Sequence, residues 1–360
     1  MGLHPMNLYE NELYREDLMA VAGAELPWEK LSGKTLVISG GTGLIGSFLA
    51  DVIMTKNQEG LHCTLCVLTR SPERAAERFS AWREDKALRL IWGDMNGEIP
   101  ETIGRADFVL HLASNTHPVQ YATDPIGTIT TNVIGLQRML DFATDRGAER
   151  FLFASSNEVY GENRGDVELF DEQYCGYIDC NTMRAGYPES KRCGEALCQA
   201  YKAQKGLDVV IPRLTRSYGP TMRMDDTKAI SQFLRKGLAG EDIVLKSAGT
   251  QFYSYTYVAD AVSGLLWILL KGKNGEAYNI ANERSDITLK DLAALIAAQA
   301  GKQVVFELPD GVEAAGYSRA TKARLDGRKL RELGWESRYD ISMGIERTMK
   351  ILGQITEGRR

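Results

Sequence analysis

The 360-residue chain has few of the features that membrane proteins and secreted proteins require. Its most apolar stretch, residues 261–270, has about half the length that a membrane span needs. The opening residues, MGLHPMNLYENELYREDL, carry acidic side chains and no uninterrupted apolar core, which is atypical of a secretory signal or a transit peptide. We therefore expect a cytoplasmic protein with no membrane partner.

Positive charge is also scarce in this sequence. The 43 Lys and Arg residues are outnumbered by 48 Asp and Glu residues, the formal net charge is -5, and no run of basic residues forms a patch. Such a chain lacks the positive field that attracts a nucleic-acid backbone, so we expect no nucleic-acid partner. The hydrophobic content of 44% is enough for one large core, or for a core with a smaller companion domain.

Residues that form disulfides or bind metals are few. The six cysteines show no disulfide framework, and Cys63 and Cys66 lie in an expected strand, where residues three apart point to opposite faces. No second CxxC completes a zinc site, and none of the four histidines lies at ligand spacing from another. We interpret His111 as a strand-end residue and His117 as a loop residue, and we expect no metal.

Short apolar strands alternate with helices from Thr35 onward. Alternation at this spacing is typical of parallel βαβ units. The sequence therefore predicts an α/β fold of the Rossmann type, a doubly wound parallel sheet with helices on both faces. The expected strands are 35–39, 61–69, 87–92, 106–114, 150–156 and 207–215, and the expected helices begin at 44 and 72 and cover 132–144 and 188–205.

The alternation weakens at about Gly219. We predict a helical N-terminal extension over 1–34, a Rossmann domain over 35–220 that binds cofactor and carries the catalytic residues, and a smaller α/β lobe over 221–360. The lobe is expected mainly to bind substrate, with part of its chain crossing back to the sheet. Its expected helices cover 226–237, 258–270 and 288–300, and its expected strands cover 277–281 and 303–308.

A glycine-rich loop joins the first strand to the first helix. The strand TLVIS runs into GGTGLIG, and a helix follows from Leu44. Gly40 permits a tight turn, Gly43 lets backbone amides approach a pyrophosphate, and Gly46 lets the helix pack closely on the strand. Because strand, loop and helix occur in the required order, we predict a dinucleotide site that includes Leu44 and Ile45, in preference to a turn without a ligand.

The second strand departs from the usual pattern for NAD. An acidic residue that binds both ribose hydroxyls normally ends this strand, whereas here it ends in LTRS. Arg70 can stack on adenine or meet a 2′-phosphate, so we expect NAD and leave NADP open. Asp94 either contacts adenine or closes a turn. The other predicted cofactor residues follow the third and fourth strands: Met95, Leu112, Ala113 and Ser114.

A strand-end serine and a tyrosine–lysine pair indicate acid–base chemistry. Tyr187 and Lys191 lie four residues apart on an expected helix, so they share a face, and an adjacent ammonium lowers the pKa of a phenol toward that of a general base. Such pairs also arise by chance on solvated helix faces. Ser156 adds weight, because it places a hydroxyl at the carboxyl edge of the sheet, where ligands of open α/β folds bind.

The order of glycine loop, serine and YxxxK pair resembles that of the extended short-chain dehydrogenase/reductases, the NAD-dependent epimerase/dehydratase family, from about Thr35 to Leu352. The resemblance implies that Ser156 hydrogen-bonds a sugar hydroxyl and that Tyr187 is the catalytic base. It also implies that Lys191 tunes Tyr187 and holds the nicotinamide ribose, which places Lys191 in the cofactor site as well.

Three segments resemble the UDP-glucuronate decarboxylases of that family: HLASNTHPVQYATDPIGTITTNVIG, YPESKRCGEALC and YGPTMRMDD. Glu158 matches a catalytic glutamate that the decarboxylases share with 4,6-dehydratases and that simple 4-epimerases usually lack. Dehydratases place an aspartate before it, whereas this chain has Asn157, which fits the decarboxylases better. The resemblance implies a redox-neutral lyase or isomerase that acts on a nucleotide-sugar, such as a UDP-sugar, through transient oxidation at C4.

Two positions depart from the family pattern. Tyr253 stands where an arginine usually contacts the nucleotide diphosphate, and Arg216 stands where an asparagine is usual. Either the two positions have exchanged roles, so that Arg216 contacts the phosphates, or Arg216 is a surface residue and the nucleotide is held differently. The predicted substrate site contains Asn157, Arg216, Tyr253 and Arg319, with Arg324 as an alternative to Arg319.

Other activities remain as alternatives to decarboxylation. The first is 4-epimerisation, with Glu158 only positioning the substrate, and the second is 4,6-dehydration. A sensor or scaffold that keeps the dinucleotide pocket without turnover is the non-enzymatic alternative, which the complete catalytic set argues against. The resemblance also implies a homodimer that pairs through the helices over 132–144 and 188–205, although packing on the sheet explains the apolar residues of these helices equally well.

Overall fold

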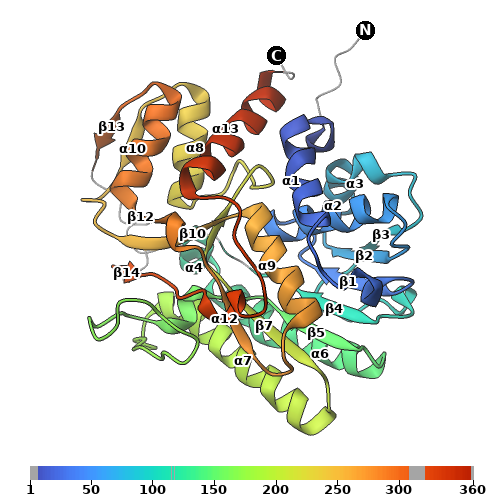
Figure 1. The fold of residues 1–360 in the computed structure, drawn as a ribbon. Helices are drawn as coiled ribbons and strands as arrows, with labels where there is room; N and C mark the ends of the chain where they lie inside the picture. The colour runs from blue at the N-terminus through green and yellow to red at the C-terminus, as the bar shows by residue number, and fades with distance from the viewer. Residues whose placement is uncertain (1–6, 115, 117, 308–320, 358–360) are drawn as a thin grey trace.

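A parallel sheet forms the centre of the computed structural model, which describes residues 7–114, 116, 118–307 and 321–357 (Figure 1). The strand order is β11-β7-β5-β4-β1-β2-β3, with β6 paired to β7. This is the order of a doubly wound Rossmann sheet, which confirms the predicted fold class. The strands are β1 (Thr35–Ser39), β2 (Thr64–Thr69), β3 (Leu88–Trp92), β4 (Phe108–His111), β5 (Arg150–Phe153), β6 (Ser155–Ser156), β7 (Val209–Leu214) and β11 (Ala277–Ile280).

Helices cover both faces of this sheet. They are α2 (Leu44–Gln58), α3 (Pro72–Arg78), α4 (Pro118–Thr123), α5 (Pro125–Thr130), α6 (Leu136–Asp145), α7 (Gly186–Lys205) and α9 (Val258–Lys271). Phe48 of α2 and Val262 of α9 belong to the core on one face, and Leu140 of α6 and Cys198 of α7 belong to the core on the other. Helices α2 and α9 therefore pack on one face of the sheet, and α6 and α7 pack on the other.

The cysteine pair is divided between the two faces, as predicted. Cys63 joins the core on the α2 side and Cys66 joins the core on the α6 side. Burial raises the pKa of the Cys63 thiol to about 12, so this thiol stays protonated at neutral pH. His111 ends β4, as expected, whereas His117 lies outside the described residues. Within the described ranges, no group of three or more His, Cys, Asp or Glu side chains is arranged to hold a metal.

The chain after β7 forms a smaller lobe and returns to the large sheet. β11 pairs with β7, and α9 packs against α2. The division of the chain at residue 220 stays a prediction. The lobe contains β8 (Arg216–Tyr218), β9 (Ile243–Leu245), β10 (Phe252–Tyr257), β12 (Asp286–Thr288), β13 (Val304–Phe306), β14 (Lys322–Ala323), α8 (Ala229–Ala239), α10 (Leu289–Ala300), α12 (Arg328–Arg331) and α13 (Ile341–Glu357).

Two helices begin differently from the sequence expectation. The segment expected as one helix over 132–144 opens with a wide π-helical turn, Thr131–Gly135, before α6. In this turn Asn132 is fully buried, and its amide donates to Ser190 Oγ at 2.9 Å. The helix expected from Asp226 begins only at Ala229, because the Asp226 side chain accepts the N–H of Lys228 at 2.9 Å and Lys228 is extended.

The N-terminal segment is tied to the C-terminal one through a buried carboxylate. Helix α1 (Glu12–Ala22) packs on α2 and α9 and lies beside α13 (Figure 1). Its Asp17 accepts hydrogen bonds from the hydroxyls of Tyr257 at 2.6 Å and Tyr339 at 2.7 Å. The guanidinium of Arg347 lies 2.8 Å away. One residue of the extension therefore contacts β10, α13 and the segment between α12 and α13.

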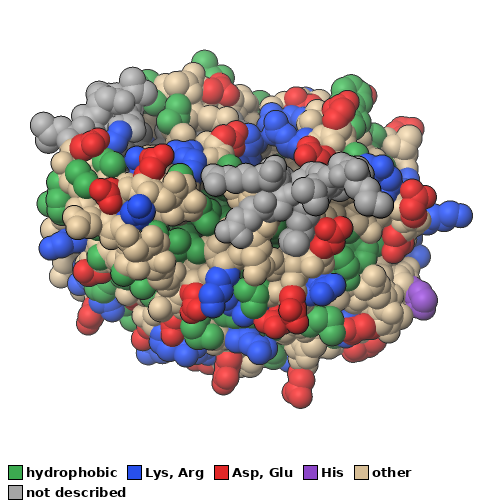
Figure 2. Space-filling view, turned by 90° about the horizontal axis from the view of Figure 1, so that it is seen from above, with side chains coloured by type: hydrophobic (Ala, Val, Ile, Leu, Met, Phe, Trp, Pro, Cys, Tyr) green, Lys and Arg blue, Asp and Glu red, His purple; other side chains and the backbone are tan. Residues whose placement is uncertain are grey.

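On the face seen in Figure 2, acidic and basic side chains are interspersed. In the part of the chain that the structure describes, no helix is both long enough and apolar enough to cross a membrane.

Candidate functional site

A cavity of about 550 Å³ opens where the strands of the large sheet end, between the sheet and the smaller lobe. The residues that were predicted for the cofactor, for catalysis and for substrate line it wherever they are described. These are Gly40, Gly43, Leu44, Ile45, Gly46, Arg70, Asp94, Met95, Leu112, Ala113, Ser114, Ser156, Asn157, Glu158, Tyr187, Lys191, Arg216 and Tyr253. Arg319 lies outside the described residues.

The glycine loop has the shape that a dinucleotide pyrophosphate requires. Gly40 has a φ of +73°, and a Cβ at this position would lie 2.6 Å from the backbone nitrogen of Ala113. A Cβ at Gly46 would lie 2.4 Å from the carbonyl oxygen of Gly40, so only glycine lets α2 start this close to β1. Gly43, the N-cap of α2, supplies no side-chain cap, which leaves the first amides of the helix to bind an anion. The loop therefore fits a bound dinucleotide.

The residues after β2 and β3 form the far side of this cofactor region. Arg70 is exposed and lines the cavity. Asp94 also lines the cavity and at the same time closes a turn, because its carboxylate accepts the N–H of Asn96 at 2.9 Å. Asp94 therefore closes a turn, and its contact with adenine stays a prediction, whereas Met95 is buried in the core on the α6 side of the sheet.

Tyr187, Ser156 and Lys191 converge on the cavity from α7 and β6. Ser156 hydrogen-bonds the side chain of Tyr187. The ammonium of Lys191 donates to the carbonyl oxygen of Ala154 at 2.9 Å and lies 4.7 Å from the ring centroid of Phe153. Burial lowers the pKa of Lys191 to about 7, because the charged form loses its hydration.

The electrostatics of Tyr187 differ from the sequence expectation. Burial and the Glu158 carboxylate raise the pKa of Tyr187 to about 12, and a hydrogen bond with Ser156 and the charge of Arg184 oppose this rise. The cation whose charge lowers the pKa of Tyr187 in this structure is Arg184. That Lys191 also lowers it, as the sequence pattern implies, stays a prediction.

Arg184 is a site residue that the sequence analysis missed. Its Nη2 lies 2.6 Å from each carboxylate oxygen of Glu158, and 15% and 20% of the two side chains are exposed. It lies in the 3₁₀ turn Met183–Ala185, just before α7 and three residues before Tyr187. The RxxY spacing was visible in the sequence, but a single arginine before a helix has no specific meaning without its partner.

Tyr121 is a second site residue that the sequence analysis did not single out, although it lies in one of the segments that resemble the decarboxylases. Its ring stacks on that of Tyr187, with 4.9 Å between centroids and an interplanar angle of 28°. The Arg184 guanidinium carbon lies 4.6 Å from the Tyr121 centroid on α4. Tyr121 therefore lies between the proposed base and the arginine.

The two positions that depart from the family pattern contact each other. Arg216 of β8 lies with its guanidinium carbon 3.5 Å from the ring centroid of Tyr253 on β10, and the two strands pair in parallel. Within the described part of the chain, Arg216 Nη1 is buried without a hydrogen-bond partner. An unused donor in the cavity wall is compatible with a ligand oxygen there. The alternative arginine, Arg324, is instead paired with Asp286 at 2.9 Å and with Glu168 at 3.2 Å, outside the cavity lining.

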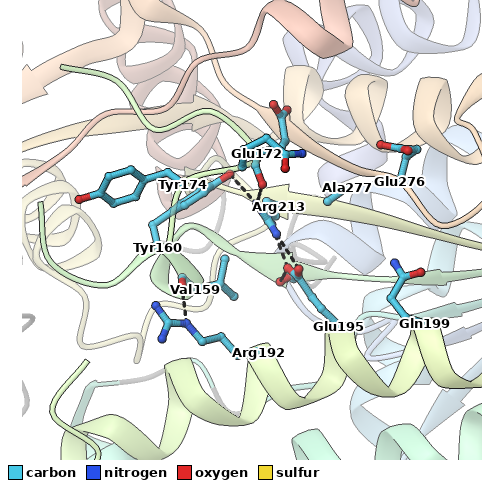
Figure 3. Close-up of polar contacts among 12 residues, drawn as sticks. Val159, Tyr160, Glu172, Tyr174, Arg192, Glu195, Gln199, Arg213, Glu276 and Ala277 are labelled. Atoms are coloured by element: carbon cyan, nitrogen blue, oxygen red, sulfur yellow. Dashed lines mark hydrogen bonds and ion pairs between the residues drawn. The ribbon is translucent and has the colours of Figure 1, made fainter. Parts of the chain in front are cut away.

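A partly buried polar network supports the strand that carries Ser156 (Figure 3). Glu195 of α7 accepts hydrogen bonds from Ser155 at 2.5 Å and from Arg213 Nε and Nη2 at 2.9 and 2.7 Å. Arg213 also donates to the hydroxyl oxygen of Tyr160 at 3.0 Å. The network connects α7, β6 and β7. It therefore holds α7, the helix that carries Tyr187, against the ends of these two strands.

The sequence is similar to those of several known proteins. Residues 36–281 match the model of the NAD dependent epimerase/dehydratase family. The chain is 32% identical over 322 residues to UDP-glucuronic acid decarboxylase 1 of Xenopus tropicalis. The aligned residues cover 88% of this chain and 71% of that protein. It is 31% identical over 311 residues to UDP-glucuronic acid decarboxylase 3 of Arabidopsis thaliana, with 86% of each chain covered.

Solved structures support the same fold. The chain is similar to the UDP-glucuronic acid 4-epimerase of Bacillus cereus, crystallised with UDP-glucuronic acid and NAD, with a TM-score of 0.77, 20% identity, and 89% of this chain and 99% of that chain covered. At this identity the likeness supports the fold alone. The family match, by contrast, spans the glycine loop, the strand-end serine and the YxxxK pair. The chain is therefore an enzyme that belongs to the NAD-dependent epimerase/dehydratase family.

Proposed function

We propose that the enzyme removes carbon dioxide from a nucleotide-linked uronic acid, UDP-glucuronate or a close relative, through transient oxidation at sugar C4. The observation that carries this proposal is the convergence of Ser156, Tyr187 and Glu158 on the cavity that the glycine loop lines, with Asn157 in place of an aspartate. The decarboxylase relatives, about 30% identical over most of the chain, support it.

Each of these cavity residues has a separate role in the oxidation at C4. NAD, when bound, supplies an acceptor and donor of hydride for C4. Tyr187 removes the proton of the C4 hydroxyl, and Ser156 holds that oxygen by a hydrogen bond. Lys191 holds the nicotinamide ribose, and the amides after Gly43 hold the pyrophosphate.

Loss of carbon dioxide follows from the 4-keto group. With C4 oxidised, the C6 carboxylate belongs to a β-keto acid. The C5–C6 bond breaks, its electron pair forms an enolate over C5 and C4, and carbon dioxide leaves. A proton then adds to C5 and hydride returns to C4, which gives a nucleotide-pentose. The sequence consumes one proton and needs no external oxidant, because the hydride removed from C4 is the one returned to it.

Asn157 argues against water elimination at this site. A 4,6-dehydratase needs an acid to protonate the departing C6 hydroxyl, and an amide cannot supply that proton. Asn157 is buried next to Glu158, so a second carboxylic acid is missing from this position in the described site. Carbon dioxide leaves without such protonation.

The mass of the product tests the proposal. We expect the purified enzyme with NAD to convert UDP-glucuronate to a product lighter by one carbon dioxide and to leave neutral UDP-hexoses unchanged. Tyr187→Phe should lower kcat by at least about a hundredfold, because it removes the base. Tyr9→Phe, at a half-buried tyrosine outside the cavity whose hydroxyl donates to Gln58, is the matched control.

Other products would overturn decarboxylation. An isomer of unchanged mass would indicate 4-epimerisation, and loss of water would indicate dehydration. No turnover of any nucleotide-sugar would favour the sensor or scaffold alternative.

We also propose a homodimer, on the basis of the family resemblance. Ile126 of α5 is 76% exposed and Met183, just before α7, is 63% exposed, which is consistent with an apolar contact beside these helices. Light scattering measures the molecular mass directly, and a monomer at micromolar concentration would contradict this proposal.

A further inference from the structure

We propose that Arg184 is a positioning residue of the reaction: it neutralises the Glu158 carboxylate in the cavity that Tyr187 also lines and, through Tyr121, fixes the Tyr187 ring. The inference rests on the proposed role of Tyr187 as base.

The ion pair with Glu158 is close and shielded from water. One nitrogen, Nη2, contacts both carboxylate oxygens at 2.6 Å, and no more than 20% of either side chain is exposed. The remaining Nε and Nη1 of Arg184 are buried and find no hydrogen-bond acceptor among the described residues. Glu158 is therefore the polar group that holds the guanidinium in place.

The Arg184 guanidinium also contacts Tyr121, whose ring stacks on that of the proposed base. Its flat face lies on Tyr121, 4.6 Å from the centroid, and Tyr121 stacks on Tyr187 at 4.9 Å. Tyr121 is 6% exposed and Tyr187 is 7% exposed, so neither ring moves freely. A shift of Arg184 would thus displace a stacked pair whose second ring carries the reacting hydroxyl.

The charge of Arg184 offsets the effect of the Glu158 charge on Tyr187. Burial and the negative charge of Glu158 both raise the pKa of Tyr187, whereas Ser156 and Arg184 lower it. Removal of Arg184 leaves the Glu158 carboxylate unopposed. The titratable or charged groups that face this cluster from the surrounding elements are Tyr121 of α4, Glu158 of η6 (Asn157–Tyr160), Arg184, Lys191 of α7, Arg216 of β8, Asp226 before α8 and Tyr253 of β10.

Lys191 cannot replace Arg184 in this respect. Burial lowers the pKa of Lys191 to about 7, so its charge is partial at neutral pH. The pKa of Arg184 is raised, despite burial, by the Glu158 charge, so Arg184 stays cationic throughout the working range.

A pH–rate profile of the holoenzyme tests the proposal. With UDP-glucuronate as substrate, Arg184→Gln should move the acidic limb of kcat/KM to higher pH by about one unit, so that activity at neutral pH falls about tenfold and recovers at high pH. Arg184→Lys keeps the charge and should stay close to the parent profile. A loss of equal size at every pH would mean a purely structural role and would overturn the proposal.

A titration that needs no turnover separates this inference from the proposed function. The ultraviolet difference between each NAD-loaded protein and its Tyr187→Phe version reports the ionisation of Tyr187 alone. We expect Arg184→Gln to raise the pKa of Tyr187, Glu158→Gln to lower it, and the double variant to return it toward the parent value. If UDP-glucuronate is not turned over, the proposed function fails, and this titration still decides the role of Arg184.

A surface arginine, Arg331, provides the control for Arg184. Arg331→Gln removes an arginine from an exposed ion pair with Glu283, 3.3 Å long and outside the cavity, and should change neither profile nor titration. An unchanged pKa of Tyr187 in Arg184→Gln overturns the inference. If that variant does not fold, Glu158→Gln and Arg184→Lys give the same decision, because one must lower the pKa of Tyr187 and the other must preserve it.

Discussion

At the scale of single residues, the contact between Arg216 and Tyr253 explains how one family pattern can be broken at two positions at once. The guanidinium lies 3.5 Å from the tyrosine ring and has a buried, unused N–H group. Since the two side chains occupy adjoining space, an arginine on either strand presents its charge to the same part of the cavity. The exchange of roles, which the sequence left as one of two interpretations, is thereby geometrically feasible.

The exchange predicts a loss and a rescue. Arg216→Asn should weaken binding of a nucleoside diphosphate by roughly tenfold to a hundredfold, because a charge-assisted hydrogen bond is lost. Adding Tyr253→Arg to that variant should restore most of the affinity, whereas Arg331→Gln should have no effect. Calorimetric titration with UDP measures all four proteins. Equal loss in the single and the double variant would mean that the positions act independently.

The sequence could identify site residues that belong to motifs, and could not identify those that act through space. Gly40, Ser156 and Tyr187 line the cavity, and the sequence could single them out because their spacing along the chain carries the information. Tyr121 and Arg184 were missed because their importance comes from a ring stack and an ion pair between distant segments. Spacing along one chain does not encode such contacts.

At the scale of elements, the β1–α2 loop is the part of the site with least room for change. Gly46→Ala would place a methyl group 2.4 Å from the carbonyl oxygen of Gly40, so the start of α2 must move away from β1. Strain of about 1–3 kcal/mol is typical of such overpacking. We expect NAD affinity to fall roughly tenfold or more, because the amides that would hold the pyrophosphate move with the helix.

NAD titration followed by protein fluorescence measures this effect. Gly353→Ala, on α13, is the control, because its nearest neighbour to a new Cβ is 4.0 Å away and it lies far along the chain from the loop. Equal NAD affinity in Gly46→Ala and Gly353→Ala would contradict the assigned role of the loop.

The same scale shows which boundaries the sequence cannot supply. Helix α2 was predicted to start at Leu44 and does so, because the glycine loop ends directly before this residue. The π-helical turn before α6 was missed, since it serves the buried bonds of Asn132 with Ser114 and Ser190. Those partners lie 18 and 58 residues away, beyond any local pattern.

At the scale of the whole molecule, a buried histidine makes folding stability depend on pH. His111 is fully buried at the end of β4, and its Nδ1 lies 2.9 Å from Ser39 Oγ. Burial, with a contribution from the Lys191 charge, lowers the pKa of His111 from 6.5 to about 3. Between these values the unfolded chain binds more protons than the folded one. The free energy of unfolding should therefore fall as the pH drops from 6.5 toward 3, by up to about 1.4 kcal/mol per pH unit.

Urea unfolding of parent and variant proteins at several pH values checks this sign. His111→Asn should be less stable than the parent at pH 7 but should lose less of its stability on acidification. His62→Asn, at an exposed histidine, should keep the parent slope. Parallel curves for His111→Asn and the parent would show that His111 does not titrate on unfolding.

The hydrogen bonds of Asp17 affect when helix α1 can be secured in the fold during protein synthesis. Tyr339, one partner of Asp17, lies 322 residues later in the chain. During synthesis on the ribosome, this buried acid has no partner until Tyr257, 240 residues later, has been made, and its partners are complete only after Tyr339 and Arg347. Helix α1 is thus synthesised long before it is secured, and until then its apolar side is left to the nascent chain and to chaperones.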